Sequence, residues 1–489
     1  MGRRVLLVNP AKEDDFPIDR IHIGLTLIGE ILASNGHQVK IMDYAFLRCL
    51  KVRIKVPDIE QVIYEFEPDI IGVSVFTYVY DECQELIARI SRCCDAVIIL
   101  GGPHMTMFSE DFSNDRRINY IVRGEAEKII LDLVQTARRG QCPVIVNCPP
   151  PSPNDIPAIN LDIVYASRYV RTYQIQLSRG CPYNCTFCNV RLIAGHRVRA
   201  RALETCLAQI VEAKRRYPNI EVIIITDDCP TFDKERFKRF LQMFKKAGIG
   251  CALLVDNVRA NLVDEEMIQL YVAAGGYNIC LGVESGDPEV FKLVNKGESI
   301  EDIIKIAKLV RKYGLLLGLC FVIGLPGDNP ERHQHSLRLA KDLKPDYVFW
   351  NMCVPWPGTV VNQWYQTQGE IGDMRNFSTL IDPEVNFKEP VCSSPGFPKE
   401  EMIKAWLAAN METYSFSSRC FRRLFSEAWK NKLYRSFFIY ATGYFPYRIR
   451  SRLIQIRRNL KQFGFGFVIL KLVRKIKKKI ALNRYIYIC

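Results

Sequence analysis

The segment QLSRGCPYNCTFCNV, at residues 176–190, places three cysteines directly after a run that reads as a β-strand. Cys181, Cys185 and Cys188 follow one another at spacings of four and three residues, so one loop can bring their thiols to one centre. Three thiolates satisfy three irons of a cubane cluster and leave the fourth iron open. Structural zinc would need a fourth ligand, for which His196 is a candidate. The spacing favours a 4Fe-4S cluster, with zinc as the alternative.

The sequence around this loop alternates between short β-like runs and helical stretches. The predicted strands lie at residues 173–178, 221–228, 251–257, 278–285, 316–326 and 346–354, and helices are predicted at residues 203–216, 234–247 and 300–313. Successive βα units with right-handed crossovers curl into a partial or full barrel. We therefore predict a partial (β/α)6 barrel over residues 167–388.

The first 141 residues form a separate series of the same kind. Apolar runs at residues 3–10, 38–44, 69–75, 96–102 and 119–127 predict an α/β domain with a doubly wound parallel sheet. A helix is predicted at residues 25–35, with Gly36 placed to end it. Such sheets bind ligands beyond the carboxyl ends of their strands, which are here Asn9, Ser74, Gly101, Gly102, Gly124 and Glu125.

Six prolines between residues 142 and 160 exclude a helix or a central strand there. We interpret residues 142–166 as an ordered linker between the two domains.

The C-terminal region, residues 389–489, is predicted to be mostly helical and basic. Residues 419–489 contain 19 Lys or Arg residues and one acidic residue, although the whole chain carries a net charge of only +14. A basic amphipathic helix of this type can lie on an anionic membrane, bind nucleic acid, or form a solvated cap. The first and third readings are favoured over nucleic acid.

Eighteen cysteines in a chain without a recognisable export signal indicate a reducing compartment. No uncharged apolar run approaches the length of about 20 residues that a membrane-spanning helix needs. We therefore expect a cytoplasmic protein, with membrane association through its tail as an alternative, and we interpret Cys251, Cys280 and Cys320 as small apolar fillers.

The motif CPYNCTFC resembles the signature of the radical S-adenosylmethionine (SAM) enzymes. The resemblance implies a 4Fe-4S cluster whose open iron binds SAM and whose electron generates a 5′-deoxyadenosyl radical. It also implies an electron donor such as flavodoxin or ferredoxin. The residues that it places at SAM are Phe187, Asp227, Asp228, Arg259, Glu284 and Gly324. Asp227 and Asp228 have an alternative role in a turn or helix cap, and Gly324 has one in its own turn.

The N-terminal segments LLVNP, GGPHMT and VRGEAE resemble the cobalamin-binding domain that precedes the barrel in one branch of this family. The resemblance implies that the strand-end residues from Asn9 to Glu125 contact cobalamin. His22, in DRIHIG, does not have the spacing of a cobalt ligand, and His104 matches a structural or tail-contacting position.

A cobalamin-dependent methyltransferase that acts on an unactivated carbon of a hydrophobic or natural-product-like substrate is the expected activity. Radical cyclisation or rearrangement without net methylation is the nearest rival. A non-catalytic cobalamin or iron–sulfur sensor is the alternative from another class.

Overall fold

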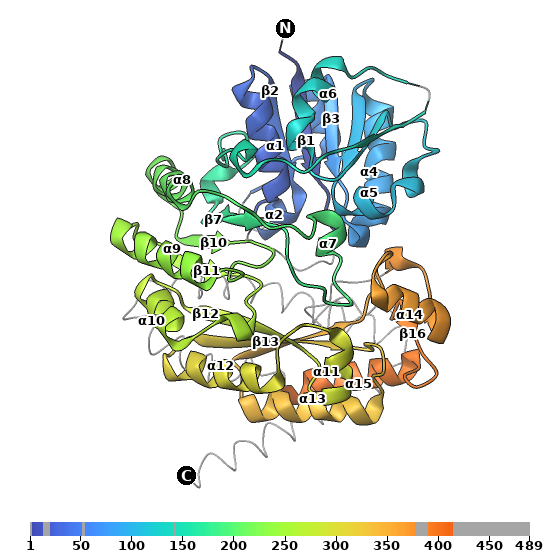
Figure 1. The fold of residues 1–489 in the computed structure, drawn as a ribbon. Coiled ribbons are helices and arrows are strands. Elements are labelled where there is room, and N and C mark those ends of the chain that lie inside the picture. The colour runs from blue at the N-terminus through green and yellow to red at the C-terminus, as the bar shows by residue number, and fades with distance from the viewer. Residues whose placement is uncertain (1, 13–19, 51–53, 141, 377–389, 414–489) are drawn as a thin grey trace.

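The computed structural model describes residues 2–12, 20–50, 54–140, 142–376 and 390–413. These residues form two α/β domains, an N-terminal one above a larger second one in the view of Figure 1. The predicted α/β class is therefore confirmed. The basic tail, residues 419–489, lies outside the described residues.

The N-terminal domain is built on a six-stranded parallel sheet with the order β2-β1-β3-β4-β5-β6. Its strands are β1 (Arg4–Asn9), β2 (Gln38–Asp43), β3 (Ile70–Ser74), β4 (Val97–Gly101), β5 (Tyr120–Arg123) and β6 (Val144–Asn147). The helices are α1 (Ile23–Ser34), α2 (Tyr44–Cys49), α3 (Ile59–Phe66), α4 (Tyr80–Cys93), α5 (Pro103–Met107) and α6 (Ile130–Thr136). The strand order reverses between β1 and β3, which is where such sheets bind ligands.

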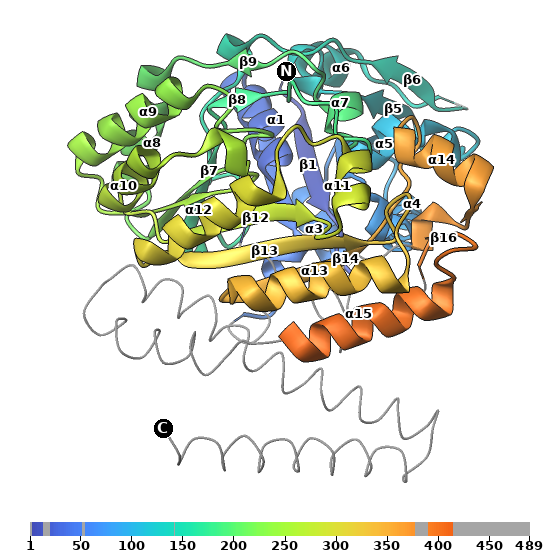
Figure 2. The ribbon, with the colours of Figure 1, turned by 60° about the horizontal axis from the view of Figure 1, so that its bottom comes forward.

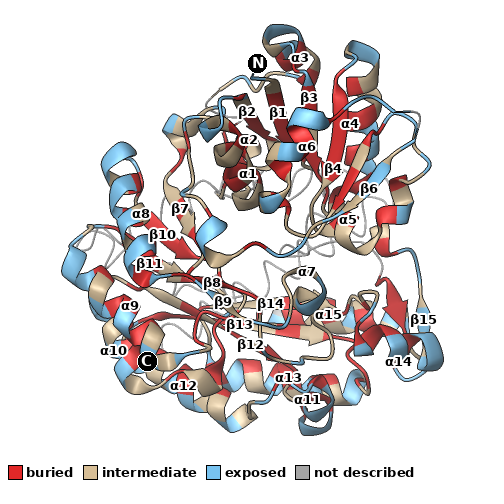
Figure 3. Cartoon of the chain, turned by 45° about the horizontal axis from the view of Figure 1, so that its top comes forward, coloured by how far each residue is buried: buried red, intermediate tan, exposed pale blue. Residues whose placement is uncertain are grey.

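The first strand shows why these runs are continuously apolar. Val5, Leu6, Leu7 and Val8 are all at most 4% exposed, because helices cover both faces of the sheet. Figure 3 shows the strands of both domains as mainly buried and the outer sides of the surrounding helices as exposed. The predicted doubly wound arrangement is confirmed.

The segment that we predicted as a linker takes part in the first sheet at two places. Residues 144–147 form β6, an edge strand paired with β5, so the sheet continues past residue 141. Further along, Val164 forms a parallel bridge with Ile41 of β2. The chain therefore runs from one edge of the sheet to the opposite edge before it enters the second domain.

The second domain contains the six predicted parallel strands. They are β7 (Thr172–Ile175), β10 (Val222–Ile225), β11 (Ala252–Val255), β12 (Asn278–Glu284), β13 (Leu316–Ile323) and β14 (Tyr347–Met352). The strands pair in the orders β7-β10-β11 and β12-β13-β14, and the bridges Leu253–Gly276 and Val258–Leu281 join the two groups. No bridge closes β14 onto β7 among the described residues, so the barrel is partial.

Helices surround the outside of this barrel. They are α8 (Leu203–Arg216), α9 (Lys234–Ala247), α10 (Glu265–Ala273), α11 (Pro288–Val294), α12 (Ile300–Lys312), α13 (Pro330–Leu343), α14 (Val360–Gln368) and α15 (Lys399–Thr413). The helices predicted at residues 203–216 and 234–247 have these bounds, and the third ends one residue earlier than predicted. Helices α13 and α15 lie side by side along the outer side of β13 and β14 (Figure 2). Among the described residues, no helix is long and apolar enough to cross a membrane.

Candidate active site

The three cysteines lie in an irregular loop whose two ends are paired. Strand β8 (Ser178–Arg179) precedes the loop, and it pairs antiparallel with β9 (Arg199–Ala200), which follows helix α7 (Val190–Ile193). Gly180 starts the loop with φ +88, and a Cβ there would lie 2.4 Å from the carbonyl oxygen of Arg197. Only glycine fits at this turn.

Cys181, Cys185 and Cys188 are free thiols of intermediate exposure. A hydrogen bond with the Cys229 thiol lowers the pKa of Cys181 to about 7. Burial raises the pKa of Cys185, and it raises the pKa of Cys188 to about 11. Binding of iron to these two residues would therefore release protons.

Two further contacts fix the middle of the cysteine loop. The Phe187 ring packs on the buried cluster that contains Val290, Leu325 and Tyr365. The backbone N–H of Thr186 donates to the carbonyl of Val294 at 3.0 Å, at the end of α11. The loop is thus held from the opposite side of the barrel as well as at its paired ends.

Asp227 and Asp228 follow β10 and bind the start of the loop. Asp227 accepts hydrogen bonds from the Leu177 N–H at 2.7 Å and from the Ser178 hydroxyl at 2.6 Å, and burial raises its pKa to about 7. Asp228 accepts the N–H of Gly180 at 2.7 Å. Both carboxyl groups orient the cysteine loop, and direct contact with SAM stays a prediction. Neither caps α9, whose N-cap is Asp233.

Arg259 lies directly beside the second cysteine. Its Nη1 is 3.7 Å from the Cys185 Sγ, and its other terminal nitrogen donates to the carbonyl of Lys296. The guanidinium carbon lies 3.6 Å from the centroid of the Tyr183 ring. A buried cation is therefore held between the cysteine loop and the turn after α11.

Glu284 ends β12 with a φ of +62, which is rare for a residue other than glycine. The pairing of β12 with β13 is irregular at this point, and the side chain turns toward Lys296, whose Nζ lies 3.1 Å from Glu284 Oε1 and 2.7 Å from Glu298 Oε1. Glu298 also accepts the N–H of Ala260 at 2.9 Å. This buried network surrounds Arg259 and Cys185.

Gly324 lies on the same side of the barrel as Phe187. It has φ +85, its N–H donates to Asp328 Oδ2 at 2.9 Å, and its carbonyl accepts from the Tyr365 hydroxyl. A Cβ would lie 2.3 Å from the terminal methyl carbon of Met402. The turn itself requires glycine here, and an additional contact with adenine stays a prediction.

The donor set around the loop fits a cubane cluster with a bound sulfonium cofactor. Three free thiols come from one loop, with the cation of Arg259 at one of them and carboxylates of Asp228 and Glu284 nearby. No group of three or more His, Cys, Asp or Glu side chains in the described part of the chain is close enough to bind one metal ion. In a cubane each thiolate binds a different iron, so the thiols need not converge on a single ion. His196 is exposed.

The strand ends of the N-terminal sheet bring the predicted cobalamin residues to one edge. Asn9 donates to Asp43 Oδ1 at 2.7 Å, at the end of β2. Gly102 has φ +97, and a Cβ there would lie 2.8 Å from Ser74 Oγ and 2.9 Å from the N of Val75. Gly101 has room for a Cβ, whose nearest neighbours would be 3.9 Å away. Gly124 has φ +90 and donates its N–H to Thr106 Oγ1 at 3.0 Å.

Two histidines lie near this edge, and both are engaged within the protein. His22 accepts the Leu25 N–H at Nδ1 and contacts Ser74 Oγ through Nε2 at 2.8 Å. His104 is fully buried, with Nδ1 at 3.1 Å from Thr77 Oγ1 and Nε2 at 3.2 Å from Asp111, and burial lowers its pKa to about 4. The role of either histidine toward cobalamin stays a prediction.

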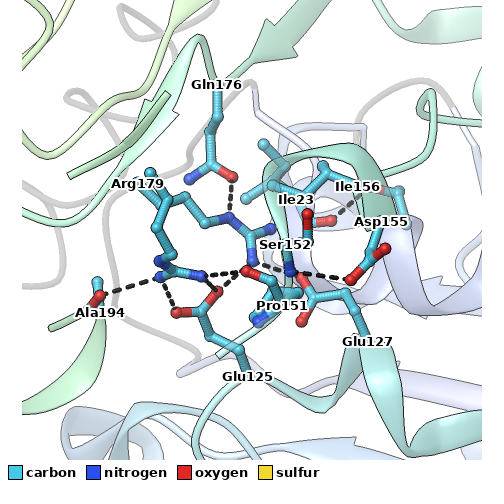
Figure 4. Close-up of polar contacts among 12 residues, drawn as sticks. Ile23, Glu125, Glu127, Pro151, Ser152, Asp155, Ile156, Gln176, Arg179 and Ala194 are labelled. Carbon is cyan, nitrogen blue, oxygen red and sulfur yellow. Dashed lines mark hydrogen bonds and ion pairs between the residues drawn. The ribbon is translucent and has the colours of Figure 1, made fainter. Parts of the chain in front are cut away.

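Glu125 was predicted to contact cobalamin, and the structure shows it in a different arrangement. It lies 2.6 Å from Arg179 Nη1 and accepts two hydrogen bonds from Arg199. Glu127 adds a second carboxylate at 2.6 Å from Arg179, and Gln176 accepts from the same guanidinium at 2.7 Å (Figure 4). A loop of the N-terminal domain thus holds both ends of the cysteine loop. Contact of Glu125 with cobalamin stays a prediction.

Other contacts also join the strand ends of the two domains. Arg20, which follows β1, pairs with Asp256 after β11. Asn189, at the end of the cysteine loop, donates to the Met107 sulfur at 3.5 Å. The carboxyl edge of the N-terminal sheet therefore faces the cysteine loop, and ligands at the two sites would face each other.

Sequence reasoning missed three residues of this site. Lys296 is 7% exposed between two carboxylates, Tyr183 lies against Arg259, and Cys229 is a fourth thiol beside Cys181. Cys229 and Lys296 lie in the segments at residues 226–233 and 295–299, which contain no sequence signal for these roles. Cys280 and Cys320, which we interpreted as fillers, are half-buried with their sulfurs 3.5 Å apart, and Cys251 is buried.

Comparisons with known proteins agree with this geometry. Residues 175–340 match the Radical SAM superfamily, and residues 16–134 match the B12 binding domain. An uncharacterised methyltransferase of Pyrococcus horikoshii is 27% identical over 84% of this chain and 92% of its own. An anaerobic magnesium-protoporphyrin IX monomethyl ester cyclase of Cereibacter sphaeroides is 24% identical, over 74% of this chain and 62% of the cyclase.

Among solved structures, a radical S-adenosylmethionine methyltransferase, TsrM, from Kitasatospora setae shares the fold. It matches with a TM-score of 0.63 and 20% identity, over 85% of this chain and 89% of that one. The match covers both domains, so the predicted combination of fold types is confirmed.

Proposed function

Because this chain belongs to the radical SAM enzymes that carry a B12-binding domain, we propose that it is a cobalamin-dependent methyltransferase acting on an unactivated carbon. The arrangement of the two sites carries this proposal. The predicted corrin edge of the first sheet faces the loop that holds Cys181, Cys185 and Cys188, and two glutamates join one to the other. A substrate between them can be reached from both sides.

When bound, the cluster supplies the electron that cleaves SAM to a 5′-deoxyadenosyl radical, and cobalamin supplies the methyl group. The residues of the chain position these groups. Asp227 and Asp228 fix the start of the cysteine loop, and Arg259 donates toward the Cys185 sulfur. Glu284 and Lys296 place a buried ion pair beside that thiol.

The Pyrococcus horikoshii relative supports methyl transfer, since it is named as a methyltransferase and spans both domains. We further propose a hydrophobic small-molecule substrate. The apolar and basic residues of the tail, 419–489, support this class, because such a segment suits an anionic membrane surface.

Radical cyclisation is the second candidate function. The cyclase of Cereibacter sphaeroides supports it, because it matches most of this chain at an identity similar to that of the methyltransferase. The two functions differ in the fate of SAM, since methyl transfer also yields S-adenosylhomocysteine.

The test uses anaerobically reconstituted full-length protein, dithionite and SAM with a trideuterated methyl group. We expect bound iron, sulfide and corrin, and formation of 5′-deoxyadenosine, labelled methylcobalamin and S-adenosylhomocysteine. Cys185→Ala should abolish deoxyadenosine formation. Deoxyadenosine without corrin or S-adenosylhomocysteine would favour cyclisation. Absence of iron and sulfide from the wild-type protein would contradict both functions.

A further inference from the structure

Three exposed apolar side chains surround the outer side of the cysteine loop. Leu192 of α7, Leu293 of α11 and Val360 of α14 are 44%, 50% and 57% exposed. Single exposed apolar residues are common on proteins, but a group of them around one functional loop indicates a contact surface.

Thr186, which lies between Cys185 and Cys188, connects these side chains. Its hydroxyl donates to the carbonyl of Leu293 at 3.0 Å, and its carbonyl accepts the N–H of Val361 at 3.1 Å. Leu192 packs against the turn before Val360, since its Cδ1 would lie 3.1 Å from a Cβ on Gly358. We call the surface formed by Thr186, Leu192, Leu293 and Val360 the cysteine-loop face.

The charge on the segments that form this face is mainly positive. Within residues 181–200, 286–297 and 355–368, Arg191, Arg197 and Lys292 are exposed, and Glu289 is the one exposed acidic residue. Pro182 is exposed as well, so the loop that carries the thiols itself forms part of the surface. An apolar centre with a basic rim is complementary to an acidic protein.

We propose that the cysteine-loop face docks an acidic one-electron donor protein of the flavodoxin or ferredoxin class. The inference rests on the proposed function, which requires reduction of the cluster. One electron passes from the reduced donor to the cluster held by Cys181, Cys185 and Cys188. The donor is oxidised by one electron, the cluster is reduced by one, and no proton or atom is exchanged.

The position of the cysteine-loop face favours a donor protein as its partner, rather than a substrate or a second enzyme domain. The face lies on the outer side of the loop, where Thr186 contacts α11 and α14, whereas Asn189 and the loop ends contact the N-terminal domain. A donor docked here approaches the thiols without passing through the space between the domains.

The experiment compares Leu192→Asp, Val360→Asp and the double variant with Val211→Asp as the matched control. Val211 is 45% exposed on α8, away from the cysteine loop. Full-length reconstituted proteins are tested for binding to a bacterial flavodoxin by biolayer interferometry at low and high salt. We expect each face variant to bind about tenfold more weakly, with the control unchanged.

A second measurement compares deoxyadenosine formation driven by reduced flavodoxin with formation driven by dithionite. The face variants should lose about tenfold in the flavodoxin-driven rate, and they should keep the dithionite-driven rate. Flavodoxin binding and turnover equal to those of the wild type would overturn the docking proposal. A second result would also overturn it. If the wild-type protein is a dimer and the face variants are monomers that still bind flavodoxin normally, the face binds a second copy of this chain.

Failure of the proposed function gives a different result. In that case dithionite produces no deoxyadenosine from wild-type protein, while the binding measurement still decides whether the face docks a flavodoxin.

Discussion

Glu125 accepts two hydrogen bonds from Arg199, one from each terminal nitrogen of the guanidinium, although the two residues belong to different domains. Their side chains are 13% and 14% exposed. Bidentate pairs of this type are strong and directional. Since Arg199 and Arg179 flank the cysteine loop, the N-terminal domain fixes the position of the cluster-binding segment.

The substitution Glu125→Gln tests this coupling. It leaves Arg179 with one carboxylate, Glu127, and removes the carboxylate that binds the guanidinium of Arg199. Removal of one partner from a buried ion pair lowers stability by about 3–5 kcal/mol, so we expect a loss in this range in urea denaturation. We also expect faster loss of iron to a chelator.

The control for this change is Glu67→Gln, which removes an exposed pair with Arg4. Exposed pairs contribute about 0–1 kcal/mol. Equal effects of the two substitutions would contradict the special role of Glu125.

Gly102 and Gly101 provide a matched pair for the corrin edge. Gly102→Ala places a Cβ against Ser74 Oγ and the N of Val75 at a positive φ, whereas Gly101→Ala has room. We expect Gly102→Ala to lower stability by about 1–3 kcal/mol and to weaken cobalamin binding, measured by absorbance titration. Unchanged binding in Gly102→Ala would show that the β4 end is not the corrin surface.

Arg259 combines a charge with a planar surface that lysine lacks. Arg259→Lys keeps the charge beside Cys185 but loses the stacking on Tyr183, which is worth about 1 kcal/mol. We expect this loss in the free energy of unfolding and a lower iron content after reconstitution. Tyr183→Phe keeps the aromatic face and should behave like wild type, and Tyr183→Leu should resemble Arg259→Lys.

His333 makes the stability of the second domain depend on pH. It is 2% exposed beside Trp350, and burial lowers its pKa to about 4, from an ordinary value of 6.5. Between pH 6.5 and 4 the unfolded chain binds a proton that the folded chain does not, so this group reduces stability as the pH falls. Linkage gives a loss of about 2 kcal/mol between pH 7 and pH 5.

The variant His333→Leu removes this dependence. Denaturation of the cofactor-free protein should show that the stability difference between wild type and His333→Leu shifts in favour of the variant on acidification. The control is His196→Leu, at an exposed position. A constant difference between pH 7 and pH 5 would contradict the assignment to His333.

The six barrel strands and the cysteine loop could be predicted because their signals are local. Apolar runs mark buried parallel strands, and three thiols within eight residues must come from one loop. The roles of Glu125 and Lys296 could not be predicted in this way. Glu125 binds two arginines that lie 54 and 74 residues away along the chain. The charge of a residue does not predict which distant residue it pairs with. Lys296 is buried between Glu284, which takes a rare backbone conformation, and Glu298, and the sequence does not mark this pairing.

Asp227 shows another limit of the sequence. Its position at a strand end predicted contact with SAM or a role in a turn or helix cap, and in the structure both of its oxygens bind the segment before the cysteines, while contact with SAM stays a prediction. A carboxylate after a strand has the same pattern whether it orients a loop or contacts a ligand. Only the distances from the carboxylate oxygens to their partners in the folded structure distinguish loop orientation from ligand contact.

The route of residues 142–166 limits how far the domains can move apart. Val164 still pairs with β2, and β7 begins at Thr172, so only about seven residues connect the last pairing of one domain to the first strand of the other. Fully extended, such a tether reaches roughly 25 Å. A linker of this length gives each domain an effective concentration in the millimolar range at the surface of the other. Even with every interdomain ion pair broken, the two halves would meet again far faster than two separate polypeptides.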